Sequence, residues 1–555
     1  MVLLIAAIVT DVAASTVLPD CLAGRWYHIQ SAAMAHPNSS GTNSDTTPIW
    51  NNNNCVYNWQ PDGTDKLRFA SPLGCIDDQW KGQMATIHAA GGSELTFQFV
   101  YHNRTVAMTG QYTSVGEHCS GAATVDMSDG SLYVRVSTHP FFMPHHEWIR
   151  VASTWLVRAA QISFTDGTRH LTPGYPTAYN GQWMRDGFYG ISMLWPVAND
   201  THRAEFGASA EWMFGKARPQ DGVMPQACFP PEPQKASSEC QYGQANTPAV
   251  NNQFFRRCTQ ANSHSCQDLD SGAFAVKLAH KIWSETRTAD DQHAFFARWA
   301  PTLERALNTT TKDPGGTGLL WSNTTAPNVG YGFQDTIVKS GVVLYSNLLY
   351  WNATGLLGAM AATEGDHALA TRMATVRTQI KRGVDRELWN SSSGIFLAST
   401  GIESGVVDVW GNALAAATGF ASLSQTQSIF DFFKRNQNTI FFEGQVRETA
   451  GTQHWAMATG HLPSGAMDAA GGTVVNYQNG GFWATPLHHV LPFLERYDRG
   501  MACALLNQSI ASFRSHGINE WVGPFYPAAH AGAPGYVASA AAVYFSSEHL
   551  RCWEY

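Results

Sequence analysis

Hydrophobic positions recur at two different spacings along this chain, and the change comes near residue 140. Before it, short runs rich in β-branched and aromatic residues are separated by Asn, Gly, Asp and Ser. The clearest runs are 24–29, 55–59, 95–101, 105–108 and 131–136. Strands and turns at this spacing are typical of a small barrel or a sandwich. The pattern therefore predicts an all-β domain over residues 20–140.

After residue 150, apolar residues recur at three- and four-residue spacing, which indicates amphipathic or buried helices. The predicted helices are 271–284, 290–307, 342–364, 366–389, 407–422, 426–436, 486–497, 501–516 and 535–549. Long loops rich in Gly, Trp, Asn and Asp are expected at 175–190, 328–341, 477–486 and 519–534. This alternation predicts a toroid of inner and outer helices over residues 150–555, with ligand sites among the loops at one mouth. The segment 220–268, rich in Pro, Gln and Cys, is expected to form an excursion over that mouth, held by disulfides.

Composition narrows the class of ligand. The chain has 555 residues, of which 44% are hydrophobic and 14% charged, enough for two domains and little for a disordered tail. With a net charge of -8 and no stripe of Lys or Arg, the sequence gives no sign of nucleic-acid binding. Nineteen Trp and eighteen Tyr fit a surface that stacks on sugar rings, although such residues also fill large cores. A neutral carbohydrate is the expected partner, and the oligomeric state is left open.

The N-terminus and the cysteines indicate the secretory pathway. Residues 1–15 combine an apolar run with small residues, as in a signal peptide, and no other stretch is apolar and long enough for a membrane span. Ten cysteines without a zinc-ligand spacing favour disulfides, of undetermined connectivity. Eight Asn-x-Ser/Thr sequons are present. A secreted or lumenal glycoprotein is predicted. We expect no metal and no cofactor, because the histidines, including His488 and His489, lack a metal-ligand spacing. The latter two are expected at a loop or helix surface.

Four motifs carry a family resemblance: Tyr179-Asn-Gly-Gln-Trp-Met-Arg-Asp186, Gly332-Phe-Gln-Asp335, Tyr477-Gln-Asn-Gly-Gly-Phe-Trp483, and Asn519-Glu-Trp521 followed by Gly535-Tyr-Val-Ala-Ser539. In this order, they resemble the six-hairpin glycosidase superfamily, which includes processing α-glucosidases and trehalases. The resemblance covers about residue 150 to the C-terminus and implies an (α/α)6 toroid. Gln334 and the continuation Thr336-Ile-Val-Lys339 depart from the α-glucosidase pattern, which leaves the substrate open. In the first domain, Gly24-x-Trp26 resembles the start of a lipocalin, and a carbohydrate-binding module is the alternative.

The resemblance implies two catalytic carboxyl groups, Asp335 as general acid and Glu520 as general base. Inverting glycosidases hold such groups about 6.5–9.5 Å apart, which leaves room for the attacking water. Tyr331, Phe333 and Ile337 are apolar neighbours that would raise the pKa of Asp335 and keep it protonated. The alternatives are an N-cap for a helix beginning near Val338 in the case of Asp335, and a solvated or ion-paired loop residue in the case of Glu520. Glu443 is the reserve base.

Seven further residues are expected to bind substrate. Asp186 is assigned to sugar hydroxyls, because its neighbour Arg185 would keep it ionised, and Trp183 is assigned as a stacking platform. Alternatively, Arg185 and Asp186 form an ion pair within the fold. The remaining subsite candidates are Arg185, Gln478, Asn479, Trp483 and Trp521, and packing in the core is the alternative for the tryptophans.

These residues predict a secreted glycoside hydrolase that cleaves an α-linked sugar by inversion. A polysaccharide lyase or sugar epimerase on the same toroid is the second possibility, although lyases of uronates favour a basic cleft that this composition does not suggest. A non-catalytic sugar-binding or lipocalin-type carrier protein is the third.

Overall fold

The computed structural model describes side chains within residues 144–553, except 165, 175–178, 231–239, 243–267, 324–338, 402–403, 452, 454, 456–477, 479 and 524–534. Between residues 24 and 135 it describes the backbone of the strands, and likewise in β14 (Gln244–Asn246), β15 (Phe255–Arg257), β17 (Asn328–Val329), β18 (Ile337–Val338) and β24 (Ala456–Met457). The chain forms two compact units, Met1–Trp155 and Leu156–Tyr555.

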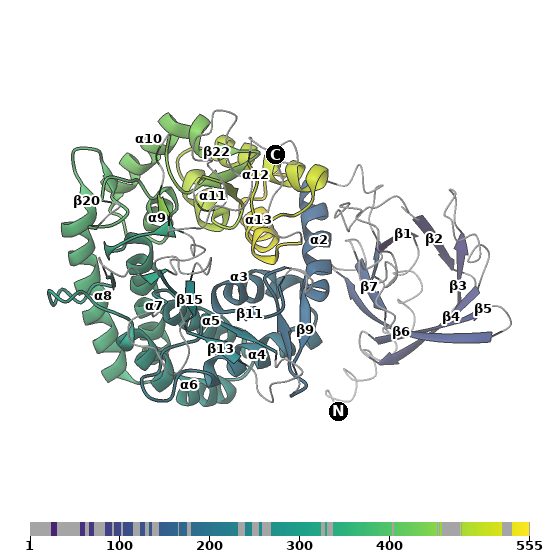
Figure 1. Cartoon of the computed structure of the whole chain (residues 1–555). Coiled ribbons are helices and arrows are strands. Elements are labelled where there is room, and N and C mark those ends of the chain that lie inside the picture. The colour runs from purple at the N-terminus through teal and green to yellow at the C-terminus, as the bar shows by residue number, and fades with distance from the viewer. Residues whose placement is uncertain are drawn as a thin grey trace, which may run out of the picture. The chain divides into compact units, whose positions relative to one another are not determined.

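The first unit contains eight antiparallel strands that close into a barrel, each paired with its neighbours in sequence and β8 paired with β1 (Figure 1). The strands are β1 (Gly24–Ile29), β2 (Val56–Pro61), β3 (Lys66–Ala70), β4 (Met84–Gly91), β5 (Glu94–Tyr101), β6 (Arg104–Ser114), β7 (Ala123–Met127) and β8 (Leu132–Arg135). Whether they belong to a lipocalin-like or a carbohydrate-binding domain stays a prediction.

Helices dominate the rest of the described chain. They are α2 (His145–Ala159), α3 (Met184–Leu194), α4 (Asp200–Gly215), α5 (Ser271–Glu285), α6 (Ala289–Thr309), α7 (Leu344–Thr363), α8 (His367–Leu388), α9 (Val409–Ala417), α10 (Leu423–Ile440), α11 (Leu487–Glu495), α12 (Arg499–His516) and α13 (Val537–Leu550). Among the described residues, no helix is long and apolar enough to cross a membrane.

Six of these helices form a closed inner ring. α3 packs on α5, α5 on α7, α7 on α9, α9 on α11, α11 on α13, and α13 returns to α3 (Figure 1). The helices α4, α6, α8, α10 and α12 each pack against inner helices that flank them in sequence. This is the inner and outer arrangement that the helical periodicity predicts.

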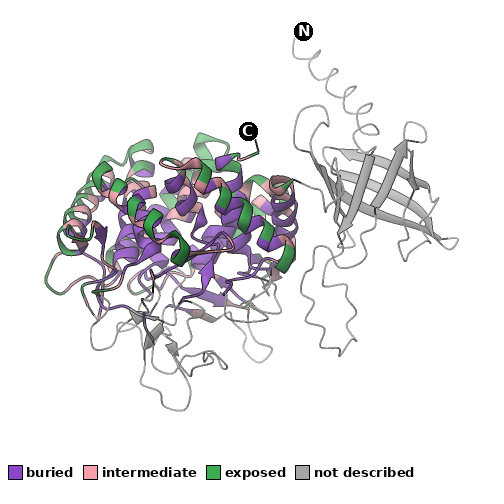
Figure 2. Ribbon diagram, turned by 90° about the horizontal axis from the view of Figure 1, so that it is seen from above, coloured by how far each residue is buried: buried purple, intermediate pink, exposed green. Residues whose placement is uncertain are grey.

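Burial separates the two sets of helices in Figure 2. The inner helix α13 is buried around most of its circumference, and its Ala538, Ala540, Ala541 and Ala542 are fully buried. The outer helix α8 buries only one stripe, and its solvent face is charged. A helix that is apolar on all sides needs protein on all sides, whereas an amphipathic helix covers the core with one face.

The predicted helices are all present, with shifted ends, but α2, α3 and α4 were missed. α3 begins inside the predicted loop 175–190 and extends past its end, so that prediction was wrong from residue 184 onward. Its sequence buries Arg185 and Asp186 and contains two glycines, which breaks the apolar pattern. One of these glycines permits close packing, since a Cβ at Gly190 would overlap a methyl carbon of Leu171. The polar and small residues of α3 make contacts with other elements of the ring, so they do not follow the apolar periodicity of a typical helix.

Small antiparallel sheets and two disulfides fix the segments between the helices. β11 (Gln182–Trp183) pairs with β12 (Ala227–Phe229), which pairs with β13 (Glu239–Gln241), and Cys228 is bonded to Cys240 across that second pair. Cys503 on α12 is bonded to Cys552, just after α13. The prediction of disulfides is confirmed for these four cysteines.

Candidate active site

The first turns of the six inner helices meet at one end of the ring. Tyr536 precedes α13 and bonds to Asp186 on α3, while Arg185 on α3 bonds to Asp268, just before α5. Lys339 precedes α7 and bonds to Asp408, the N-cap of α9. Trp410 on α9 lies against Trp483, which precedes α11, and Trp483 lies against Tyr536. These contacts join the helix beginnings around the ring, where helix dipoles favour negative charge.

Two predicted carboxylates lie beside one tyrosine at this mouth. The Tyr536 hydroxyl donates a hydrogen bond of 2.7 Å to Asp186 Oδ1, and Asp186 is 6% exposed. Burial raises the pKa of Tyr536 well above its usual value, and the nearby charges of Asp186 and Glu520 raise it further. Glu520 is also 6% exposed. Asp186 and Glu520 are far apart in sequence, and Tyr536 stands within electrostatic reach of both.

A short β-interaction holds the loop that carries Glu520. The backbone N–H groups of Phe482 and Val522 each donate to the other's carbonyl at 2.8 Å. Phe482 belongs to β25 (Phe482–Trp483), which pairs with β23 (Gln445–Arg447). The backbone N–H of Gly535 and of Tyr536 both donate to Ile518 O. Glu520 is therefore supported from both sides by a sheet and by the start of α13.

Arg185 forms a buried ion pair that joins α3 to α5. Its Nη2 lies 3.0 Å from Asp268 Oδ2 and 3.6 Å from Asp270 Oδ1, and both carboxylates are fully shielded from solvent. Asp268 also accepts from the backbone N–H of Asp270 at 2.9 Å. The guanidinium thus pairs with two aspartates that precede α5, and this ion pair fixes the first turn of α3, which also carries Asp186.

Aromatic side chains surround the carboxylates. Trp183 is partly exposed, and its ring meets Tyr179 and Phe229 edge-on at centroid distances of 5.4 and 5.2 Å. Trp483 and Trp521 are buried, at 1% and 6% exposed. Trp183 is therefore the predicted platform that solvent reaches in this structure, whereas Trp483 packs in the core, as the alternative interpretation for it expects.

A second buried charge cluster lies at the start of α7 and α9. Lys339 Nζ is 3.0 Å from Asp408 Oδ2 and 3.0 Å from Glu448 Oε1, and it lies 4.2 Å from the centroid of the Trp455 ring. Burial lowers the pKa of Lys339, but the charges of Asp408 and Glu448 outweigh it and the pKa is raised. Burial raises the pKa of Glu448 to about 8, because the favourable effect of Lys339 is smaller. One cation thus faces two carboxyl groups, of which one holds a proton near neutral pH.

Two hydroxyl groups connect this cluster electrostatically to the first. Tyr345, in the first turn of α7, is hydrogen-bonded to Tyr189 on α3. Burial raises the pKa of Tyr345 well above its usual value, and the charges of Asp408 and Asp270 add to it. Tyr189 lies within electrostatic reach of Asp270 and Asp186, and burial raises its pKa as well. The residues at the beginnings of the inner helices therefore belong to one polar network.

The remaining predicted site residues fall in different places. Asp335 and Asn479 lie outside the described residues, and Gln478 is buried. The helix after Asp335 begins at Leu344, capped by Val343, so the alternative of an N-cap near Val338 was wrong. Glu443 lies in the turn between β22 (Phe441–Phe442) and β23, where it accepts a hydrogen bond of 2.5 Å from Ser512 on the outer helix α12. The structure does not show it with Asp186 and Glu520.

Of the two histidines expected at a loop or helix surface, His489 is buried and His488 is partly exposed. His488 and His489, expected at a surface, lie in the first turn of the inner helix α11, and His489 is 4% exposed. His488 Nδ1 lies 2.8 Å from Thr485 O. Burial lowers the pKa of His488 to about 3, and the charge of Lys277 lowers it further. Within the described part of the chain, no group of three His, Cys, Asp or Glu side chains could hold a metal ion.

Sequence reasoning missed several residues of the network: Asp268, Asp270, Lys339, Asp408, Glu448 and Tyr536. A signal was available for three of them. Asp268 and Asp270 stand immediately before the predicted helix at 271, and Asp408 stands at the beginning of the one predicted at 407. An acidic residue at a helix start reads as an N-cap, and only the ring shows that these starts converge.

No family model matches this chain, and no curated protein sequence matches it. Solved structures do. A GH63 mannosylglycerate hydrolase from Thermus thermophilus, in complex with glucose, has a TM-score of 0.50 at 14% identity and covers 72% of this chain and 99% of its own. The chain therefore shares the fold of that structure. An uncharacterized conserved protein from the same organism gives the same values. A metal-independent α-mannosidase structure from Streptococcus pneumoniae gives a TM-score of 0.46 at 13% identity, over 73% of this chain and 93% of its own.

Proposed function

We propose that this protein is a secreted glycoside hydrolase that cleaves an α-linked glycosidic bond with inversion of configuration. Asp335 is the proposed general acid and Glu520 the proposed general base. The solved structures of this fold include a named glycoside hydrolase, which supports the reaction class. The observation that carries the proposal is the meeting of Glu520 and Asp186 around Tyr536, at the mouth of a closed helical ring.

The environment of Glu520 suits a base that activates water. Its loop is held on both sides by backbone hydrogen bonds, so its carboxylate is oriented before substrate arrives. Asp186 accepts a hydrogen bond from Tyr536, which orients its carboxylate at the position where a sugar hydroxyl is proposed to bind. Trp183, partly exposed, supplies the apolar face on which a pyranose stacks.

Hydrolysis of a panel of substrates by the purified protein tests the proposal. The panel contains aryl α- and β-glycosides, α-linked disaccharides and mannosylglycerate, the last because a solved neighbour is named for it. Asp335→Asn and Glu520→Gln are expected to lose at least about a hundredfold in rate, as expected for removing a general acid or base. Glu304→Gln, which alters an exposed ion pair with Arg372, is the matched control.

The anomer of the first-formed product, followed by proton NMR, tests inversion. A product of opposite anomeric configuration supports two carboxyl groups with a water between them, and retention would refute the inverting mechanism. If Glu520→Gln keeps its activity, the base is assigned wrongly, and Glu443→Gln and Asp186→Asn are compared next. If no glycoside is hydrolysed, assays for lyase and epimerase products, and for sugar binding without turnover, decide between the other two classes.

Secretion is part of the same proposal. The N-terminal apolar run, the sequons and the disulfides Cys228–Cys240 and Cys503–Cys552 support it. Expression in a eukaryotic secretory host, with mass analysis before and after removal of N-glycans, tests both cleavage near residue 15 and glycosylation.

A further inference from the structure

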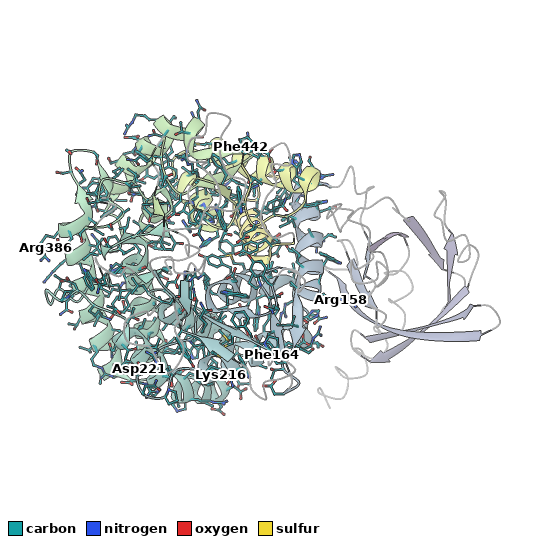
Figure 3. The ribbon with its side chains drawn as sticks, in the orientation of Figure 1. Arg158, Phe164, Lys216, Asp221, Arg386 and Phe442 are labelled. Atoms are coloured by element: carbon teal, nitrogen blue, oxygen red, sulfur yellow. A yellow bond between two sulfur atoms is a disulfide. The ribbon has the colours of Figure 1, made fainter. Side chains whose placement is uncertain are left out.

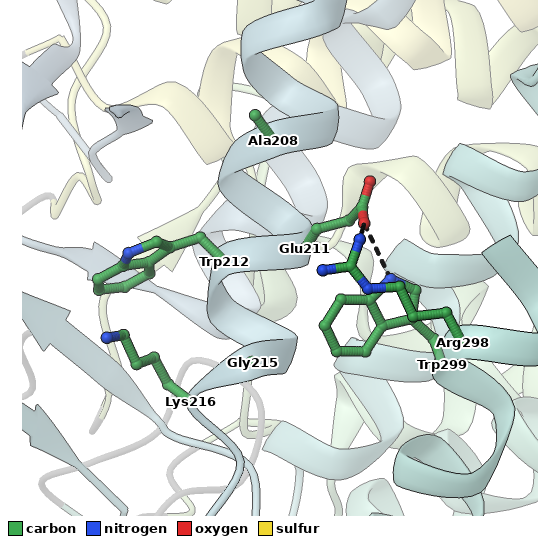
Figure 4. A pocket seen from close by; sticks show the side chains of 7 residues that line it. All are labelled: Ala208, Glu211, Trp212, Gly215, Lys216, Arg298 and Trp299. Atoms are coloured by element: carbon green, nitrogen blue, oxygen red, sulfur yellow. Dashed lines mark hydrogen bonds and ion pairs between the residues drawn. The ribbon is translucent and has the colours of Figure 1, made fainter. Parts of the chain in front are cut away.

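A cavity of about 410 Å³ opens between the outer helices α4 and α6. Ala208, Glu211, Trp212 and Gly215 line it from α4, followed by Lys216, and Arg298 and Trp299 line it from α6. The α4 residues are spaced by three and four positions, so they share one face of the helix. Ala208 and Gly215 are exposed and small, and they leave room between the larger side chains (Figure 4).

Both indole rings are fixed by hydrogen bonds to carboxylates. Trp212 Nε1 donates to Asp166 Oδ2 at 2.8 Å, and the rings of Phe164 and His170 meet Trp212 at centroid distances of 5.0 and 4.6 Å. Trp299 Nε1 donates to Glu211 Oε2 at 3.0 Å. The aromatic walls are therefore oriented in advance, so binding costs little side-chain entropy.

Polar groups of both kinds border these walls. Arg298 Nη1 donates to Glu211 Oε2 at 3.0 Å, and the guanidinium retains further N–H groups. Glu211 keeps Oε1 as an acceptor. The Lys216 ammonium lies 4.6 Å from the centroid of Trp212, and no described residue forms an ion pair with it. A cation–π contact at an exposed site is weak, so the ammonium can leave the ring face for a ligand oxygen.

We propose that this cavity is a second carbohydrate-binding site, which holds a neutral glycan chain on the outer surface of the toroid. A pyranose presents an apolar face and a rim of hydroxyl groups that both donate and accept. The cavity offers the half-buried Trp212 ring for the face, Lys216 and Arg298 as donors, and Glu211 as acceptor, while the buried Trp299 ring lies under the Arg298 guanidinium. A polyanion fits less well, because Glu211, together with Asp166 on the Trp212 indole, balances the charges of Lys216 and Arg298 and leaves no excess positive charge.

This site is separate from the mouth. Glu520 and Asp186 belong to the inner ring, whereas the cavity lies on two outer helices, and the two sites share no residue. Lys216, at the end of α4, lies toward the outer edge of the ring (Figure 3). Such a site would tether the protein to a glycan whatever reaction the mouth performs. Glycan binding at this cavity therefore does not depend on the proposed hydrolase activity.

Affinity electrophoresis of the full chain in native gels tests it. The gels contain dextran, yeast α-mannan or soluble starch as neutral probes, or polygalacturonate as the anionic probe. The Glu520→Gln background keeps the gel glycan intact. Onto it we place Trp212→Ala, the filling variants Ala208→Leu and Gly215→Leu, and Trp183→Ala to report binding at the mouth. A Cβ at Gly215 would lie 3.8 Å from Trp299, an ordinary contact, so filling there leaves the fold intact. Phe545→Ala, at an exposed ring on α13, is the matched control.

At least one neutral glycan is expected to retard the protein. Trp212→Ala and both filling variants are expected to weaken that retardation by about fivefold, the effect of losing one aromatic contact. Phe545→Ala should not change it. The proposal is overturned if no neutral glycan retards the protein, if only Trp183→Ala weakens retardation, or if polygalacturonate alone retards it. Thermal unfolding of each variant, together with hydrolysis of a small glycoside by the same cavity variants on the wild-type background, separates loss of this site from loss of the fold or of the mouth.

Discussion

The titration of Glu448, one of the two buried carboxyl groups beside Lys339, is expected to make the stability of the protein depend on pH. Glu448 has a folded pKa of about 8, against an ordinary value of 4.5, because burial penalises its charged form. Between these values the folded protein binds a proton that the unfolded chain has lost. Its stability therefore falls as pH rises from about 4.5 to about 8. Glu448→Gln has a neutral side chain at every pH, and its amide oxygen can still accept from Lys339.

The magnitude follows from the shift. One pKa unit corresponds to 1.36 kcal/mol, so the titration of Glu448 removes about 3 kcal/mol from the wild type between pH 5.5 and 8.5. Unfolding entropy near 2.1 cal/mol/K per residue gives about 0.8 kcal/mol/K for a unit of about 400 residues, and hence about 4 °C in Tm. At pH 5.5 the two proteins should differ by less than about 1 kcal/mol, since both are neutral at this position.

Thermal unfolding of the two proteins at pH 5.5, 7 and 8.5, followed by tryptophan fluorescence, measures the effect. Other shifted groups, such as Lys277 with a pKa lowered to about 7 by burial, titrate in both proteins and cancel in the comparison. Glu448→Gln should gain about 4 °C on the wild type between the lowest and the highest pH. Parallel Tm curves would refute the argument that Glu448 holds a proton in the fold.

Three further predictions concern the ring and its closure. Tyr536→Phe removes the donor to the buried Asp186 carboxylate, so Tm should fall by an amount equivalent to about 1–3 kcal/mol, and KM for any substrate found should rise; an unchanged Tm would mean that water replaces the hydroxyl. Arg185→Met leaves two buried aspartates without their cation and should cost about 3–5 kcal/mol in urea unfolding near neutral pH, with recovery in acid, whereas loss of equal size at every pH would contradict it. Joint replacement of Cys503 and Cys552 by Ser opens a loop of 49 residues and should lower the free energy of unfolding by about 4 kcal/mol on the chain-entropy model. If the double variant and the oxidised wild type have the same Tm, the disulfide makes no such contribution to stability.

Local patterns in the sequence were enough to predict the toroid and the order of its helices. Apolar periodicity is a local property, and it located nine helices to within a few residues at most ends. It failed at α3, whose buried face includes two charged residues and two glycines where the periodicity expects apolar side chains. These residues are required by packing within the ring. The periodicity also placed His489 at a surface, because a polar residue carries no local sign of burial.

Which polar residues meet depends on how the ring closes. Asp186, Glu520 and Tyr536 are brought together because α13 packs against α3, and a contact across 350 residues leaves no trace in local spacing. For the same reason the sequence could name Arg185 but not its partners before α5, and it kept Glu443, whose side chain bonds to the outer helix α12, as a reserve for Glu520. Residue type and periodicity determine which side chains each helix contributes. Closure of the ring determines which of these side chains come into contact.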